Sequence, residues 1–358
     1  MQQLLQVNRP EPVIAEIEIG AFTRESDIPK TIQALLAGKQ ILVEEFYSNG
    51  LHLLRELTTY LKNTLPNESF LEQRAFRAEF RKLSNLILIH VKEHKLMVRK
   101  APVIGWLEKL YPELNDFFLP LPQIQGLNSA WQWYEKGIHI PVLRNKIHPY
   151  YGVYFPTRFE HLILFDNWLK RYEGAKKTAI DIGIGSGVLS LLMVQHGFQK
   201  VFGTDINPNA IIGLSESMEG TKLARKIEID FGHLFGKWEK PTELIVFNPP
   251  WLPAMQELNN LDEAIYYNEQ LFPEFFEAAH KRLLPDGKIV ILFSNLAQIT
   301  QVTTEHPIEK ELLSGERFIL EKCHRKSVKD ASEKTKRNQH WRGKEEVELW
   351  VLKPLIKG

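Results

Sequence analysis

The 358-residue sequence has a single cysteine and no long apolar run. Cys323, as the only thiol, cannot form a disulfide within the chain or supply a cysteine-based zinc cluster. No apolar stretch approaches the roughly 20 residues that a membrane-spanning helix needs. The first residues, MQQLL, lack the basic and apolar regions of a secretion signal. These absences predict a cytoplasmic protein that does not contact a membrane.

Charge is nearly balanced, with 45 Lys and Arg against 44 Asp and Glu. The 44% hydrophobic and 25% charged content is typical of a soluble globular protein, and the length suggests one large or two ordinary domains. The exception is segment 322–344, which has nine Lys or Arg and only two Asp or Glu. This basic segment, with Trp341 inside it, is either a surface for a nucleic-acid backbone or a solvated hairpin loop.

The pattern of apolar residues changes near residue 137. Before it, apolar residues recur at helical spacing in 51–61 and 69–89, and a third helix is expected over 104–110. We therefore predict a mostly helical N-terminal domain, residues 1–136, that recognises the substrate or partner. After it, the runs 138–143 and 151–155 are typical of two short strands, expected to form a hairpin.

The remaining residues alternate between strand and helix patterns. A helix near 158–171 and an amphipathic helix over 270–284 are among the predicted helices. The seven predicted strands are 178–182, 200–204, 226–229, 244–247, 288–293, 318–321 and 347–352. Such alternation specifies a parallel sheet covered by helices on both faces. We predict an α/β fold over 137–358, a doubly wound Rossmann-like sheet ending in an antiparallel pair.

A glycine-rich loop follows the first of these strands. The sequence Ala-Ile-Asp-Ile-Gly-Ile-Gly-Ser-Gly places Asp181 before Gly183, Gly185 and Gly187. Glycines let a backbone turn tightly and approach a ligand, and ligands of open α/β sheets bind at the carboxyl ends of the strands. A dinucleotide loop would need a third glycine where Val188 or Ser190 stands. The loop instead resembles that of class I methyltransferases, which use S-adenosylmethionine (SAM) as methyl donor.

The resemblance implies a SAM site that spans three strand ends. Asp181 would lie near the ammonium of SAM or order the loop. The next strand ends in Asp205 and Ile206, and a carboxylate there would accept from both ribose hydroxyls. The third ends in Asp230 and Phe231, which would bind adenine through its exocyclic amine and pack on its ring. The product would be S-adenosylhomocysteine.

The fourth strand is followed by Asn248, Pro249, Pro250 and Trp251. This sequence resembles the [DNS]-P-P-[YFW] motif of methyltransferases that act on planar nitrogens. The side-chain oxygen of Asn248 and the carbonyl of Pro249 would accept the two N–H bonds of the acceptor and align its lone pair. Prolines fix the backbone, and Trp251 offers a ring for a base or an amide. A Pro-rich turn is the structural alternative.

Residues 137–295 resemble the release-factor glutamine methyltransferases, which methylate a side-chain amide of a protein. That family has Asn-Pro-Pro-Tyr where this chain has Trp251, and the run 252–267 is closer to a less-characterised bacterial branch. By the same resemblance Tyr150, Tyr151, Pro156 and Arg158 would lie on the approach to the reacting centre, where Arg158 would hold an anionic group; hairpin packing is the alternative.

The sequence therefore predicts an N-methyltransferase whose acceptor is a protein side-chain amide such as glutamine. A nucleic-acid exocyclic-amine methyltransferase is the first alternative, because Trp251 would stack a base and the basic segment would hold phosphates. A small-molecule methyltransferase and a non-catalytic SAM-binding scaffold are further alternatives. No metal is expected, since the 12 histidines lack ligand spacing.

Overall fold

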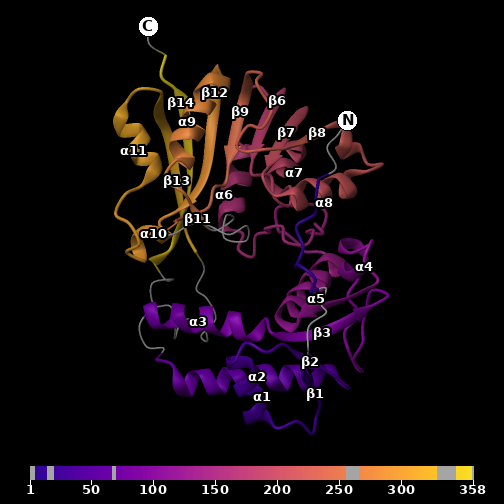
Figure 1. The fold of residues 1–358 in the computed structure, drawn as a ribbon. Helices are drawn as coiled ribbons and strands as arrows, with labels where there is room; N and C mark the ends of the chain where they lie inside the picture. The colour runs from indigo at the N-terminus through magenta and orange to yellow at the C-terminus, as the bar shows by residue number, and fades with distance from the viewer. Residues whose placement is uncertain (1–4, 14–19, 67–69, 255–265, 329–343, 357–358) are drawn as a thin grey trace. The chain divides into compact units, whose positions relative to one another are not determined.

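The computed structural model describes residues 5–13, 20–66, 70–254, 266–328 and 344–356. The chain divides into two compact units (Figure 1). Arg9–Lys136 form the N-terminal unit, whereas Met1–Asn8 and Gly137–Gly358 form what we call the sheet unit. No helix in the described ranges has both the length and the apolarity that a membrane crossing requires.

The N-terminal unit is largely helical but also contains a sheet. Its helices are α1 (Ile28–Leu36), α2 (Tyr47–Thr64), α3 (Phe70–Ser84), α4 (Trp106–Leu110) and α5 (Leu121–Lys136). Its strands are β1 (Gly20–Phe22), β2 (Ile41–Val43), β3 (Ile87–Lys92), β4 (Lys95–Leu96) and β5 (Asp116–Pro120). They pair in the order β1-β2-β3-β4, with β5 also bound to β3. This five-stranded sheet was not predicted from the sequence.

The predicted helix over 69–89 is wrong in its last turn. Helix α3 ends at Ser84, and strand β3 begins at Ile87. The residues between them form a turn in which the Leu86 amide donates to the Leu83 carbonyl. Ile87, Leu88 and Ile89 are fully buried, and β-branched residues suit a buried strand better than a helix end.

The sheet unit contains seven paired strands flanked by helices. The strands are β6 (Thr178–Ile182), β7 (Lys200–Asp205), β8 (Ile227–Phe231), β9 (Thr242–Phe247), β12 (Leu283–Ser294), β13 (Phe318–Ser327) and β14 (Glu346–Pro354). The helices are α6 (Glu160–Leu169), α7 (Val188–Gln195), α8 (Pro208–Met218), η1 (Lys222–Arg225), α9 (Leu271–Arg282), α10 (Leu296–Ile299) and α11 (Pro307–Ser314). Two short strands, β10 (Leu252–Pro253) and β11 (Tyr266–Tyr267), pair separately.

The strand order is β13-β14-β12-β9-β6-β7-β8. Strands β8, β7, β6, β9 and β12 are parallel, whereas β14 is antiparallel to both β12 and β13. Strand β13 bulges between Leu320 and Lys322. The predicted α/β fold, with a seven-stranded Rossmann-like sheet that ends in an antiparallel pair, is confirmed.

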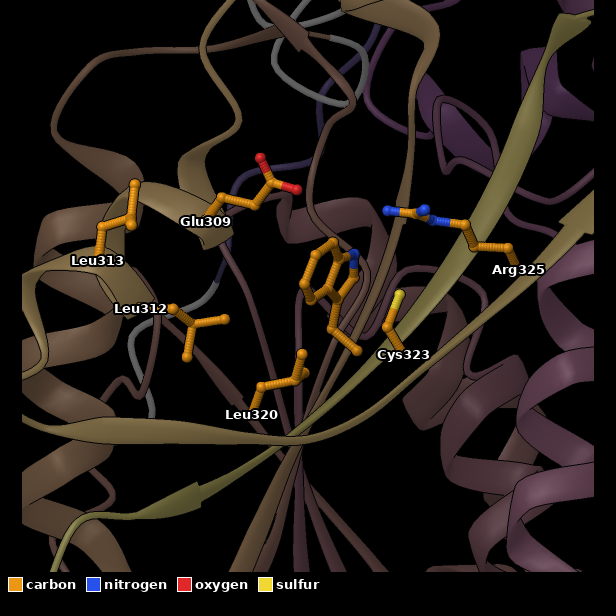
Figure 2. A pocket seen from close by; sticks show the side chains of 7 residues that line it. Glu309, Leu312, Leu313, Leu320, Cys323 and Arg325 are labelled. Atoms are coloured by element: carbon orange, nitrogen blue, oxygen red, sulfur yellow. The ribbon is translucent and has the colours of Figure 1, made fainter.

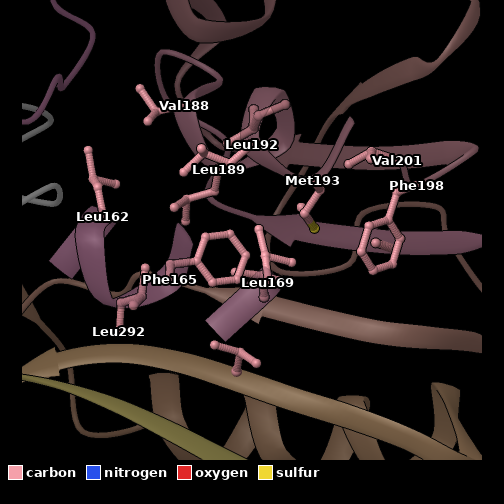
Figure 3. Packing of buried hydrophobic residues seen from close by; sticks show 14 of the residues in the cluster. Leu162, Phe165, Leu169, Val188, Leu189, Leu192, Met193, Phe198, Val201 and Leu292 are labelled. Atoms are coloured by element: carbon pink, nitrogen blue, oxygen red, sulfur yellow. The ribbon is translucent and has the colours of Figure 1, made fainter. Parts of the chain in front are cut away.

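Apolar side chains cover both faces of this sheet. On one face α6 and α7 pack Phe165, Leu189 and Leu192 against Leu292 of β12 (Figure 3). On the other, α9 contributes Phe275 and Phe276 to a second apolar cluster. Because both faces are buried, the central strands consist of nearly continuous apolar runs. Packing on both faces also holds the carboxyl ends of these strands in fixed positions relative to one another.

The predicted hairpin of 138–143 and 151–155 is absent from the structure. Only an isolated bridge joins Ile138 to Ile147. Pro141 and Pro149 have no N–H to donate to a ladder. Side chains bind this backbone instead, since the Tyr151 carbonyl accepts from Asn209 Nδ2 at 2.7 Å.

Two sequence interpretations fall partly outside the described residues. In the run 252–267, residues 255–265 lie outside them. In the basic segment 322–344, residues 329–343, Trp341 included, also lie outside them.

Candidate functional site

The glycine loop and the Asn-Pro-Pro-Trp turn leave neighbouring strands at the same end of the sheet. Strands β6 and β9 are parallel and adjacent, with Ile182 opposite Phe247 in the register. Chain connections run outward in opposite directions from this pair, so it is the switch point of the sheet. Open α/β sheets bind their ligands at such a point, outside the carboxyl ends of the strands.

The glycine loop adopts a backbone that favours glycine at three alternate positions. The φ angles of Gly183, Gly185 and Gly187 are +67°, +51° and +79°. A Cβ at Gly183 would have no atom within 4 Å, so open space lies above the loop. Gly187 precedes the first turn of α7, where backbone N–H groups lack helical partners. The loop is thus a cradle of bare backbone.

Asp181, at the end of β6, is buried beneath this cradle. Its Oδ2 accepts a hydrogen bond of 2.6 Å from the Ser190 hydroxyl, whereas its Oδ1 is buried without any partner. Burial raises the pKa of the Asp181 carboxyl to about 7; hydrogen bonds from Ser190 oppose that rise, and the charge of Asp205 adds to it. A cationic group at Oδ1 would supply the missing interaction.

Asp205 ties the second strand end to the glycine loop. Its Oδ2 accepts from the Gly185 amide at 2.8 Å, and its Oδ1 accepts from the Asn207 amide at 2.8 Å. A carboxylate has about four lone-pair sites, so a carboxylate can accept more than two hydrogen bonds. The same carboxylate that would bind a ribose therefore also fixes the loop.

The third strand end lies beside the second and presents apolar surface. Asp205 and Phe231 are in register between β7 and β8. Ile206 and Phe231 are 43% and 44% exposed, which is high for large apolar side chains placed at neighbouring strand ends. Asp230 Oδ2 accepts from the Lys237 amide at 3.1 Å. This arrangement offers an apolar surface and a carboxylate to a flat, amino-bearing ring.

At the end of β9, Asn248 has the second unpartnered oxygen of the site. Its Oδ1 is buried and accepts no hydrogen bond. Leaving such an acceptor unsatisfied costs about 1–3 kcal/mol, which a donor on a ligand would recover. Pro249, next in the chain, is buried and Pro250 is partly buried. An amide-type N–H has a ready acceptor here.

Trp251 is held in place by two contacts. Its indole N–H donates to the Leu292 carbonyl at 3.3 Å, and its ring meets the ring of His161 edge to face at 5.6 Å. His161 is buried, and burial lowers its pKa to about 4 while the charge of Glu160 opposes the shift. The His161 imidazole is therefore neutral, and the two contacts fix the position of the Trp251 ring.

The predicted approach residues have internal partners. The Tyr151 carbonyl binds Asn209, as described above, and Pro156 is buried. Arg158 forms an ion pair of 2.5 Å with Glu345, whose side chain is only 3% exposed. An anionic group of a substrate would have to share or displace that partner at Arg158.

A cavity of about 480 Å³ lies elsewhere, between α11 and the strands β13 and β14. Figure 2 shows Leu312 and Leu313 on one side of it and Cys323 and Arg325 on the other. Because none of its lining residues follows β6, β7, β8 or β9, this cavity is separate from the candidate site. The described residues contain no group of three or more His, Cys, Asp or Glu side chains that could hold a metal ion.

Comparison with known proteins finds that part of the sheet unit is similar to methyltransferases. Residues 162–316 match the model of the methyltransferase small domain. The resemblance to class I methyltransferases is confirmed. Among curated relatives, the "Putative protein N5-glutamine methyltransferase MJ0928" of Methanocaldococcus jannaschii is 31% identical over 122 residues, which are 34% of this chain and 57% of that protein.

Two further matches are to ribosomal protein L11 methyltransferases. The ribosomal protein L11 methyltransferase of Vibrio parahaemolyticus is 37% identical over 62 residues, or 17% of this chain and 21% of that protein. The match thus spans little more than half of the first relative and about a fifth of the second. A solved structure of the L11 methylase from Lactobacillus delbrueckii has a TM-score of 0.40 at 17% identity, covering 61% of this chain and 92% of that one.

Sequence reasoning missed two side chains of the methyltransferase domain. Ser190 binds Asp181, and its signal is a lone hydroxyl within the apolar helix α7. His161 packs against Trp251, but α6 contains no spacing that would reveal a contact with a residue 90 positions away. A buried polar residue in an apolar helix is thus a usable signal, whereas a tertiary ring contact is not.

Proposed function

We propose that this protein is a SAM-dependent N-methyltransferase that acts on a planar nitrogen, and that the acceptor is a protein side-chain amide such as glutamine. The observation that carries the proposal is the pair of buried, unpartnered oxygens, Asp181 Oδ1 and Asn248 Oδ1, at the ends of adjacent strands. One lacks a cation and the other lacks an N–H donor. An amino-acid tail and an acceptor amide supply these two groups.

The residues present fit SAM. The ammonium of its tail would bind Asp181 Oδ1 beneath the bare backbone of Gly183 and Gly185. Asp205 would accept from the ribose hydroxyls while it continues to hold the loop. Adenine would pack on Ile206 and Phe231, with its amine directed to Asp230. When bound, SAM supplies an activated methyl group on a sulfonium.

Asn248 and Pro249 orient the acceptor. An amide nitrogen delocalises its lone pair into the carbonyl and is a poor nucleophile. The Asn248 oxygen and the Pro249 carbonyl accept its two N–H bonds, which turns the lone pair toward the methyl group and stabilises the positive charge that develops. With SAM bound, transfer would form one N–C bond, leave the electron pair of the broken C–S bond on sulfur, and release one proton from the nitrogen to water.

One comparison favours an amide over a nucleobase. The relative from M. jannaschii, which is 31% identical over 122 residues, has a name that refers to protein glutamine. We also propose that the N-terminal unit selects the protein substrate.

The test is transfer of radiolabelled methyl groups from SAM into a cell extract that is then separated into protein, nucleic-acid and small-molecule fractions. We expect label in protein, and recovery of N5-methylglutamine after proteolysis. Label confined to nucleic acid or to small molecules would overturn the assignment of the acceptor.

The role of Asn248 is tested with Asn248→Ala. We expect kcat to fall about 10²- to 10³-fold, because an interaction made in the transition state is removed, with a smaller change in SAM affinity. Asn167→Ala is the matched control, since Asn167 is exposed on α6 in the same unit. Full activity of Asn248→Ala would show that the acceptor nitrogen is aligned by other groups.

A further inference from the structure

Basic side chains form a row along the outermost strand of the sheet. Among the described residues, strand β13 pairs only with β14. Its residues Lys322, His324 and Lys326 stand opposite Val351, Leu349 and Val347. Residues directly opposite in an antiparallel pair share a face, so these three lie on one face of β13. At about 3.4 Å per residue, neighbours in the row are roughly 6.8 Å apart.

Helix α6 brings a third cation, Arg171, beside the two lysines of this row. It packs against β13 and β14 on this face, and Arg171 follows its last turn. Arg171 and Lys322 both lie close enough to lower the pKa of His324, after the larger effect of burial. We call Arg171, Lys322, His324 and Lys326 the basic row.

The basic row lacks acidic partners in the part of the chain that the structure describes. Arg171, Lys322 and Lys326 form no ion pair there. On β13 and α6 themselves, Glu321 binds Lys288 and Asp166 binds both Lys170 and His196. Like charges held together without counterions repel one another, and that repulsion would be relieved by an anionic ligand.

We propose that the basic row binds the phosphodiester backbone of a nucleic acid. Two lysines and an arginine around a neutral imidazole, which can still donate an N–H, are complementary to a linear polymer that carries one charge per residue. A lipid surface would also require apolar side chains that insert beside the cations. On this face the residues opposite the row, Val347, Leu349 and Val351, are buried beneath the sheet's own helix and cannot insert.

The inference is independent of methyl transfer, because binding is measured without SAM. The assay is fluorescence anisotropy of a labelled 20-nucleotide single strand, made as RNA and as DNA, with the full-length protein over a series of salt concentrations. For Lys322→Gln/Lys326→Gln we expect the negative slope of log K against log salt to become shallower by about 1.4. We expect the affinity at 0.1 M salt to fall about 25-fold. Equal losses for both polymers identify the backbone alone as the ligand, whereas a loss for RNA only identifies RNA.

The control is Lys222→Gln/Lys226→Gln, which removes the same charge near β8, at the opposite edge of the sheet. We expect it to keep the wild-type slope, and both double variants to keep the wild-type unfolding midpoint in urea. Equal loss in the two variants would overturn the proposal, because it would show a general charge effect. Unchanged binding by Lys322→Gln/Lys326→Gln, or binding only to phosphatidylserine vesicles, would overturn it as well.

Discussion

The affinity for SAM should rise with pH between 5.5 and 7.5, because Asp181 must be ionised to bind the ammonium of the amino-acid tail. With a pKa of about 7, the carboxyl is ionised in about 3% of molecules at pH 5.5 and about 76% at pH 7.5. If only the ionised form binds, affinity increases about 25-fold, or about 1.9 kcal/mol. Above this range the ligand's own amine begins to titrate, so the window ends near pH 7.5.

Isothermal titration calorimetry of the wild type and Asp181→Asn measures this dependence. The variant keeps the shape and the Ser190 contact but has no charge, so we expect weak binding with no slope. In the absence of ligand, the folding stability that Asp181 contributes depends on pH in the opposite direction. A carboxyl whose folded pKa lies above its ordinary 3.8 contributes stability at low pH that is lost as pH rises through 7. A flat affinity for the wild type, or a wild-type slope in the variant, would refute the role of Asp181.

Two further substitution or labelling experiments test the packing. Gly203→Ala would place a Cβ against Ile184 of the glycine loop, so we expect the free energy of unfolding, measured in urea, to fall by about 1–3 kcal/mol. The control is Gly126→Ala in α5, where open space surrounds the new Cβ, and we expect it to raise the free energy of unfolding by up to about 1 kcal/mol. Equal effects of the two substitutions would contradict the predicted overlap. Burial and the charge of Glu348 raise the pKa of Cys323 to about 11, so iodoacetamide at pH 8 should label the folded chain at least tenfold more slowly than the urea-unfolded chain. Equal rates would show that the thiol is not shielded.

The strands of the sheet unit could be predicted because several constraints agree in each of them. The run that contains Asp181 is apolar, ends in an acid and is followed by glycines, and β6 occupies the predicted residues without change. Strand β13 extends to Ser327, beyond the predicted 318–321, because its outer residues are polar and only pairing with β14 makes them a strand. Local sequence detects buried strands better than edge strands.

The N-terminal sheet escaped prediction for a related reason. Strands β1 and β2 have three residues each, which is too short for an alternating pattern to emerge. In the segment that follows Lys136 the error was the opposite, since Tyr151 and its neighbours have strand-like side chains. There the backbone carbonyls accept hydrogen bonds from the side chains of Asn207 and Asn209 instead of pairing with another strand, and no sequence pattern reveals these tertiary contacts.

The bulge in β13 has a consequence for association between copies of the chain. An outermost strand exposes unpaired backbone groups that invite another chain to extend the sheet. The bulge between Leu320 and Lys322 interrupts the regular spacing of those groups, and the charged side chains that follow would repel an identical strand brought alongside. The same irregular, charged edge therefore protects the chain from growing into a continuous intermolecular sheet.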